Sequence, residues 1–373
     1  MSRNERRALI AAAAAIGLSM TPADAARMVE PTGYAEMRQL VEAHPEIDQA
    51  ILPGLSAAPL LMGGKKAALK PQDVFNTSLW TGTGAARPIT TGIDSGEGSL
   101  VWGKARANST LHLLFDTVRG AQNYVTSNSA DPQYNTPGTL DAFTSTGYAV
   151  GSSLNLNGSG RANVGWQFRC APNFFKIVQF TGDGAATQGI TNPLGANLGR
   201  CFIKRTDATD NWVTWHRSFP SVSGLLNSGF DGETSAISVS DSLITVGSTR
   251  SLNVSGATYI VYCFGHDTTS DGLIQCGSYI GNGSASGPIV NLGWRPQWLL
   301  VKSTNSSNLV GADWLIFDTA RGISNTLAPN NVNAEISAAR ISLSAAGFQV
   351  IDSTYHTNFS GSGYAYMAIR EAA

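Results

Sequence analysis

From residue 73 onward, apolar residues occur in short runs of strand length, separated by turns rich in glycine, asparagine and serine. Such runs between turn residues predict antiparallel β-strands. The run at residues 113–120 returns at 315–322, and a degraded copy occupies 213–219. The aromatic residue of this run stands at positions 115, 215 and 317. A fixed period of about 100 residues indicates one structural unit used three times.

Further landmarks recur in the same order within each copy. A Gly-x-Gly turn follows the first strand, a later strand ends in lysine, and an asparagine turn precedes the last strand. These landmarks are Gly82/Gly84, Gly182/Gly184 and Gly281/Gly283, then Lys104, Lys204 and Lys302, and finally Asn157, Asn253 and Asn358. We therefore predict a mainly β chain of three tandem antiparallel β-sandwiches at residues 73–171, 172–268 and 269–373, each with six or seven short strands. The joins are only a few residues long, so we expect the copies to pack closely.

The N-terminal part follows a different pattern. Residues 1–52 read as short helices, and residues 53–72 as an extended linker interrupted by proline and glycine. The first 26 residues have the basic start, apolar run and Ala-Asp-Ala sequence of a secretory signal. The alternative, which we favour, is an alanine-rich helix that stays attached. The apolar run is too short to span a membrane.

The composition narrows the class of protein. Charged residues make up 14% of the chain, against about 25% in typical domains, the chain has 40 glycines, and its net charge is −1. No basic stripe is present to neutralise phosphates, so we expect no nucleic-acid partner. The cysteines lie in or beside apolar strands without a CxxC pair, so we expect buried thiols, one incidental disulfide being left open, and no metal or cofactor: Cys170, Cys201, Cys263 and Cys276.

The recurring run at residues 113–120 contains the residues that most resemble catalytic groups. Each intact copy carries one aspartate, Asp116 or Asp318, followed three residues later by Arg119 or Arg321. A glycosidase needs two carboxylates about 5–10 Å apart, and each copy offers one. We therefore expect these aspartates to bind turn amides and the neighbouring arginine. No metalloprotease, serine-hydrolase or calcium-loop motif is present, so we predict that the chain is not an enzyme.

Three residues remain as candidates for contact with a ligand. His216 replaces the aspartate in the middle copy, and a structural or surface role is favoured for it. Most tryptophans are expected in the core, but Trp294 lies beside Arg295 and Pro296 in a turn-like segment and is a better candidate for exposure. The candidates for ligand contact are thus Trp294, Arg295 and His216. The Asn-x-Ser patterns at Asn157 (as Asn-Gly-Ser), Asn253 and Asn358 match glycosylation acceptors, but their repetition at one turn favours a role in the hairpin.

These landmarks resemble a repeat domain of unassigned function that is common in structural proteins of tailed phages and is usually described as concanavalin-A-like. The matching segments are residues 102–104, 115–120, 166–175, 180–184, 204–207 with Trp212, His216 and Arg217, and 366–370. The resemblance covers about residues 74–370. It implies a concanavalin-A-like or jelly-roll sandwich in a virion protein, and it supplies no catalytic or binding residues.

The expected function is that of a tailed-phage virion protein, a tail fibre or similar appendage. Residues 1–72 would attach it to other virion proteins, and the β body would contact the host surface, including its glycans. A homo-oligomer is expected, with a trimer favoured, and no membrane association. One alternative is a capsid decoration or head-fibre protein. A second is a secreted bacterial glycan-binding protein or hydrolase, which would have a mature N-terminus near Ala26.

Overall fold

The structure is a computed structural model, which describes residues 69–372 except 221, 225, 229–230, 235 and 305–311. Contacts divide the chain into two compact units, Met1–Ala68 and Leu69–Ala373. The helices expected within residues 1–52 and most of the expected linker lie outside the described residues. Everything below concerns the second unit, the β body.

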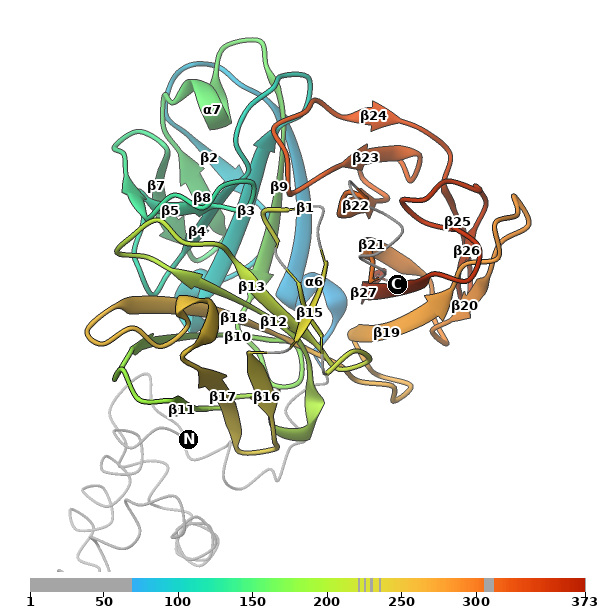
Figure 1. Ribbon diagram of the computed structural model, residues 1–373. Coiled ribbons are helices and arrows are strands. Elements are labelled where there is room, and N and C mark those ends of the chain that lie inside the picture. Colours follow the sequence, from blue (N-terminus) through green and yellow to red (C-terminus); the bar gives the residue numbers. More distant parts are fainter. Residues whose placement is uncertain are drawn as a thin grey trace, which may run out of the picture. The chain divides into compact units, whose positions relative to one another are not determined.

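The first repeat begins with the one-turn helix α6 and continues through nine strands (Figure 1). Its elements are α6 Pro71–Val74, β1 Phe75–Thr81, β2 Arg87–Thr90, η2 Ser95–Glu97, β3 Ser99–Ala105, β4 Leu113–Asp116, β5 Asn123–Thr126, β6 Tyr134–Asn135, β7 Leu140–Thr144, β8 Gly147–Val150, α7 Leu154–Asn157 and β9 Ala162–Arg169.

The second and third repeats follow the same order of strands. The second comprises β10 Phe175–Thr181, β11 Thr187–Thr191, η3 Gly195–Asn197, β12 Leu198–Arg205, β13 Val213–His216, β14 Val222–Gly224, β15 Asp231–Thr234, β16 Ile237–Val239, β17 Leu243–Gly247, η4 Thr249–Ser251 and β18 Thr258–Gly265. The third comprises β19 Ile274–Ile280, β20 Ile289–Asn291, β21 Pro296–Ser303, β22 Leu315–Asp318, β23 Asn325–Leu327, β24 Ile336–Ser337, β25 Ile341–Ser344, β26 Gly347–Val350 and β27 Gly363–Arg370.

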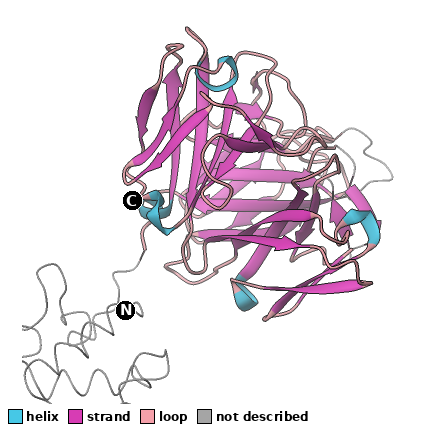
Figure 2. Cartoon of the chain, turned by 90° about the vertical axis from the view of Figure 1, so that its left-hand side faces the viewer, coloured by secondary structure: helices cyan, strands magenta, loops and turns pink. Residues whose placement is uncertain are grey.

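Sheet topology is identical in the three repeats. The first pairs its strands as β1-β9-β3-β4-β5-β6 and β2-β8-β7, and the second and third repeat this order with their own strands. All pairings are antiparallel. In each repeat one hydrophobic core joins the six-stranded to the three-stranded sheet, and the strands lie in layers (Figure 2). The prediction of three β-sandwich units is thus confirmed. Six or seven strands per copy was an undercount, because strands such as β6 and β24 have only two residues and show no apolar pattern.

The central strands of the six-stranded sheets are buried on both faces. In β3, Leu100 and Trp102 face one core while Val101, between them, faces another. This alternation is what a strand requires, since successive side chains point to opposite sides. It recurs in β12 and β21. One face of each sheet packs on the three-stranded sheet of its own repeat, and the other packs against the neighbouring repeats.

The second face forms a core that all three repeats share. It contains Trp102 and Trp166 from the first repeat, Phe202 from the second and Trp298 from the third, all fully buried. At its centre the Phe168 ring lies 5.0 Å from Phe75, 5.8 and 5.4 Å from Phe175 and Phe264, and 5.7 Å from Trp298, centroid to centroid. Close packing of the copies is confirmed, and the reason is this common hydrophobic core.

The asparagine turn has the same structural role in every copy. In the third repeat Asn358, fully buried, accepts a hydrogen bond from the Asn282 amide at 2.8 Å and donates to the carbonyls of Ser284 and Asp352 at 2.7 and 2.8 Å. Asn157 and Asn253 bind the corresponding Gly-x-Gly turns. The expected role in the turn is confirmed, and the bonded, buried amides leave no room for a glycan in the folded chain.

Replacing Asn358 with alanine should therefore destabilise the body. The Asn282 amide and two carbonyls would lose their partner, which costs about 1–3 kcal/mol for a buried polar group. Urea denaturation should show a lower midpoint with an unchanged slope. The exposed Asn211 provides the control, since its replacement should change the free energy of unfolding by less than about 0.5 kcal/mol and leave the midpoint almost unchanged. Equal midpoints for the two variants would contradict the assigned role.

Candidate functional site

The Asp–Arg pair of the first repeat is buried and hydrogen-bonded within its own turn. Asp116 Oδ1 accepts from the backbone amides of Val118 and Arg119 at 3.0 and 2.9 Å, and Oδ2 accepts from Arg119 Nε at 2.5 Å. Arg119 Nη2 also donates to the Leu114 carbonyl at 2.8 Å. In the third repeat Asp318 and Arg321 repeat the pattern. The predicted binding of turn amides and of the adjacent arginine is confirmed.

Each of these pairs also contacts the last strand of another repeat. The Tyr262 hydroxyl in β18 donates to Asp116 Oδ2 at 2.8 Å and accepts from Arg119 Nη2 at 2.9 Å. In the same way Trp166 Nε1 in β9 donates to Asp318 Oδ2 at 3.0 Å. Trp166 and Tyr262 occupy corresponding positions in corresponding strands. The carboxylates thus accept from amides, arginine and an aromatic donor of another repeat, and Asp318 shares Arg321 with Glu335, whose Oε2 lies 2.9 Å from Arg321 Nη1.

The middle repeat contacts the third repeat through a histidine instead of an aspartate. His216, in the place of the aspartate, is 5% exposed, and its Nε2 lies 3.2 Å from the Tyr366 carbonyl in β27. Met367, which lacks a hydrogen-bond donor, occupies the position of Trp166 and Tyr262. Contacts therefore run from the first repeat to the second, from the second to the third, and from the third to the first. The structure places His216 at an interface between repeats and out of reach of a surface ligand.

Burial of two histidines makes the stability of the body dependent on pH. The pKa of His112 lies well below its usual value because the ring is fully buried and Lys104 and Arg321 are near. The pKa of His216 is likewise held well below its usual value by burial and by Arg200. In the unfolded chain both titrate near pH 6.5. Their contribution to stability is complete above that pH and is lost as the pH falls below it.

Lowering the pH from 7.5 to 5.5 should therefore reduce the free energy of unfolding by about 1.4 kcal/mol for each of these histidines. Carboxylates titrate mostly below this window. Urea midpoints at the two pH values measure the effect, and a His216→Gln variant should show a smaller pH dependence than the parent chain. A stability that stays constant or rises on acidification would contradict the neutral, buried state of these rings.

The other two ligand-contact candidates differ in exposure. Trp294 is 5% exposed and belongs to the core of the third sandwich, so the expectation that it is exposed was wrong. The turn-like segment before β21 directs its ring inward, onto the sheet. Arg295 lies at the surface and pairs with Glu371, Nε to Oε2, at 2.7 Å. The three candidates are not brought together, and contact of Arg295 with a ligand stays a prediction.

The recurring lysines Lys104 and Lys204 are buried and hydrogen-bonded within the body. Burial lowers the pKa of both Lys104 and Lys204 to about 8, and their ammonium groups donate to backbone carbonyls. One hydrogen bond joins Lys204 to the Ala130 carbonyl of the first repeat at 3.2 Å.

The four cysteines are buried, as expected, and are free thiols; burial raises the pKa of Cys201 to about 12. Within the described residues, no group of three metal-ligating side chains could hold a metal ion.

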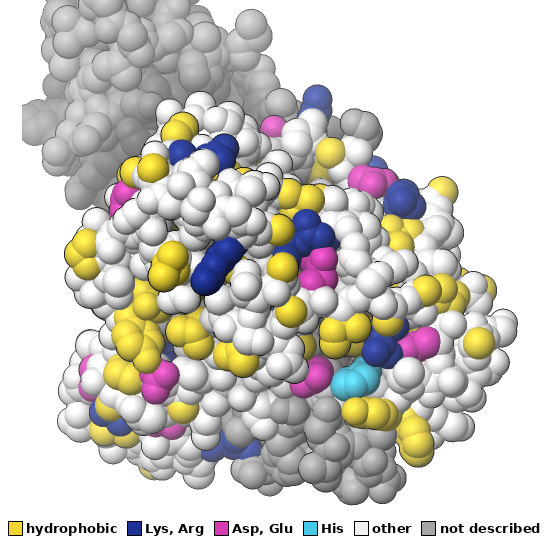
Figure 3. All heavy atoms as spheres, turned by 90° about the horizontal axis from the view of Figure 1, so that it is seen from above, with side chains coloured by type: hydrophobic (Ala, Val, Ile, Leu, Met, Phe, Trp, Pro, Cys, Tyr) yellow, Lys and Arg dark blue, Asp and Glu magenta, His cyan; other side chains and the backbone are white. Residues whose placement is uncertain are grey.

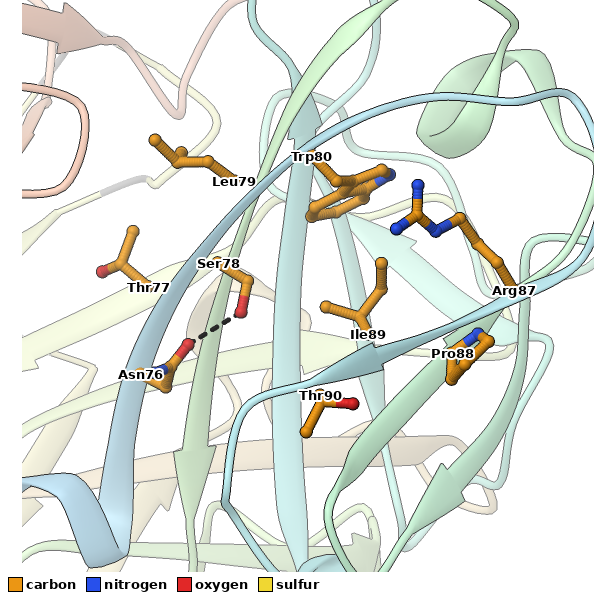
Figure 4. A pocket seen from close by; sticks show the side chains of 9 residues that line it. All are labelled: Asn76, Thr77, Ser78, Leu79, Trp80, Arg87, Pro88, Ile89 and Thr90. Carbon is orange, nitrogen blue, oxygen red and sulfur yellow. Dashed lines mark hydrogen bonds between the residues drawn. The ribbon is translucent and has the colours of Figure 1, made fainter.

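An open groove lies at one side of the first sandwich, between β1 and β2. Both are edge strands, since β1 pairs only with β9 and β2 only with β8. We call it the edge groove; it encloses about 460 Å³ and is lined by Asn76, Thr77, Ser78, Leu79, Trp80, Arg87, Pro88, Ile89 and Thr90. Trp80 and Ile89 point toward one another across it, with the Arg87 guanidinium beside the Trp80 ring (Figure 4). Sequence analysis missed this groove, because pairing decides which strands are edges.

The face of the molecule drawn in Figure 3 carries little organised charge. Seen from above Figure 1, basic and acidic side chains are scattered among polar uncharged ones, with apolar side chains between them (Figure 3). No helix in the described part of the chain is long and apolar enough to cross a membrane.

Comparison with known proteins gives a family. The profile described as "Domain of unknown function (DUF7483)" matches residues 70–373. The chain belongs to this family. The DUF7483 match covers all three sandwiches, so the family unit is the whole β body, close to the residues 74–370 that the resemblance covered. This boundary agrees with the shared core, which no repeat completes alone.

Other comparisons add little to this DUF7483 assignment. No curated protein matches the chain. Among solved structures, one titled "Crystal Structure of the STIV MCP" is similar at 10% identity and a TM-score of 0.18, covering 79% of this chain and 95% of that chain. A likeness of this size carries no argument about fold or function.

Proposed function

We propose that this chain is a structural protein of a tailed-phage particle, a tail fibre or similar appendage, that acts by contact rather than by chemistry. Residues 1–72 attach it to other virion proteins, and the β body, with concanavalin-A-like sandwiches, meets glycans of the host surface. The observation that carries the proposal is the use of the repeated acid groups. Asp116 and Asp318 accept hydrogen bonds from arginine and from turn amides. Each also accepts one from another repeat, from the Tyr262 hydroxyl or from Trp166 Nε1.

The packing of the repeats also supports a role as a rigid body. Three sandwiches contact each other in cyclic order around one core, so each uses its second sheet face inside the chain. Such a body presents its edges and loops outward, and the joins between its sandwiches, at residues 170–174 and 266–273, are short. The expected homotrimer would then form through surfaces other than these sheet faces. Native mass spectrometry of the full chain reports the oligomeric state directly.

Imaging purified particles with an antibody against the β body tests the proposal. Label on tail appendages of intact particles is the expected result. Label on the shell would favour the capsid-decoration alternative, and particles without label would contradict a virion role. Mass measurement of the native chain separates the secreted alternative, which requires a mature N-terminus near Ala26.

A further inference from the structure

The edge groove contains a buried polar group without a partner. Trp80 is 8% exposed, and its Nε1 forms no hydrogen bond within the described residues. The ring lies between β1 and β2 with this nitrogen on the side nearest Arg87 (Figure 4). A buried N–H left unpaired costs about 1–3 kcal/mol. The Nε1 atoms of Trp102, Trp215, Trp294 and Trp298 are unpaired among the described residues too, but of these tryptophans only Trp80 lines the edge groove. An acceptor from a bound molecule would supply the missing bond.

The corresponding positions of the other repeats are filled. In the second repeat, Val178 and Phe180 of β10 stand in the places of Ser78 and Trp80 and pack against the sandwich core. In the third, the place of Ser78 is taken by Gly277, and the Tyr366 hydroxyl lies 2.3 Å from where its Cβ would be. The side chains that line the edge groove are therefore not repeated in the other two copies.

The strand paired with β1, which is β9, also differs from its counterparts in the other two repeats. Phe180 stacks on Tyr259 at 4.7 Å, and Tyr279 stacks on Tyr364 at 5.0 Å, in both cases on the residue paired with it across the sheet. The residue paired with Trp80 is Asn163, which offers no ring. The Asn163 Oδ1 is buried and, like Trp80 Nε1, has no partner among the described residues. In the first repeat Trp80 instead packs edge-on against Tyr148 of β8, with ring centroids 6.3 Å apart, and Trp80 Nε1 and Asn163 Oδ1 stay unpaired.

The lining favours a ligand rich in hydroxyl groups. Asn76 and Ser78 provide an amide and a hydroxyl, joined to each other by a hydrogen bond of 2.7 Å from Ser78 Oγ to Asn76 Oδ1, whereas Trp80 and Ile89 are buried and leave little apolar surface open. Arg87 is the one charged residue of the nine and already donates to the Thr81 carbonyl at 3.3 Å, so a multiply charged anion would be poorly neutralised. A peptide adding to β2 would meet Pro88, which lacks an amide N–H. The volume lies within the about 300–1,000 Å³ usual for small-molecule sites.

We propose that the edge groove of the first repeat binds a saccharide, whose hydroxyls pair with Trp80 Nε1, Asn76 and Ser78. This rests on the proposed function for the source of the sugar, a host-surface glycan. It assigns the contact to the first repeat alone and to the side of the sandwich between its two edge strands, away from Trp294 and His216.

Fluorine NMR of the full chain, labelled with 5-fluorotryptophan, tests this assignment. A Trp80→Phe variant identifies the Trp80 resonance. Maltotriose, triacetylchitotriose and trigalacturonate supply a neutral, an N-acetylated and an acidic probe, each titrated to about 10 mM so that millimolar dissociation constants are detected. We expect the Trp80 resonance to shift with at least one probe while those of the fully buried tryptophans stay in place.

Two serine-to-valine variants on first strands complete the test. Ser78→Val places in the groove the residue that the second repeat already holds there, and it should weaken binding at least tenfold. Ser278→Val, on the exposed side of β19, should leave binding unchanged. A Trp80 resonance that no probe moves, or binding that survives Ser78→Val, would overturn the saccharide site. That failure leaves particle imaging unaffected, whereas sugar binding by a chain absent from particles would refute only the virion role.

Discussion

Replacing Asp116 with alanine should lower the free energy of unfolding by about 3–5 kcal/mol, because it leaves the buried Arg119 without a counter-ion. The side chains of Asp116 and Arg119 are 0% and 3% exposed. The Tyr262 hydroxyl would lose its acceptor in the same step, so the contact between the first two repeats is weakened as well. Chemical denaturation followed by tryptophan fluorescence measures the loss.

Two further variants make this prediction specific. Asp318→Ala should lower the free energy of unfolding by less than Asp116→Ala does. The reason is that Arg321 Nη1 also pairs with Glu335 at 2.9 Å, so the arginine keeps a carboxylate partner. Asp207→Ala removes the acid of the exposed Arg205–Asp207 pair and should cost less than about 1 kcal/mol. If Asp116→Ala were no more costly than Asp207→Ala, the Asp–Arg motif would not be the structural element described above.

Replacing Phe168 with alanine should lower the free energy of unfolding by about 3–5 kcal/mol, because it removes buried apolar surface and leaves a cavity. Its ring contacts aromatic rings of all three repeats, so the loss should appear in the unfolding of the whole body rather than of the first sandwich alone.

The matched control is Phe359→Ala, the same truncation at a ring that is 44% exposed. It should cost less than about 1 kcal/mol. Hydrogen exchange of the two variants shows where stability is lost. Faster exchange confined to the first repeat in Phe168→Ala would contradict a shared core, and faster exchange in all three repeats is expected.

The sequence predicted the repeats well because strand-length apolar runs, turn glycines and turn asparagines are local signals. Asn358 shows this, since its position before the last strand already indicated a role in the turn. The contacts between repeats depend on pairing across the molecule, which no local pattern contains. Trp294 illustrates the limit: its turn-like neighbours suggested exposure, but the adjoining strand β21 carries it into the core.

One contact between the repeats could have been predicted from the sequence by comparing corresponding positions of the three copies. Where the motif carries Asp116 or Asp318, the corresponding position of the last strand of another repeat is Tyr262 or Trp166, both donors. Where it carries His216, that position is Met367. A correlated change of this kind inside one chain indicates contact. The edge groove left no comparable trace, because Asn163 and Ser78 look ordinary until their counterparts are aligned on the sheets.

Differential scanning calorimetry of the full chain at neutral pH tests most directly whether three sandwiches form one body. At about 0.7 kcal/mol per residue near 60 °C, unfolding the matched region as one unit should absorb about 210 kcal/mol. We predict one transition for the β body, with a van't Hoff enthalpy close to the calorimetric enthalpy. Separate transitions, or a van't Hoff enthalpy near one third of the calorimetric value, would contradict a core that the three repeats share.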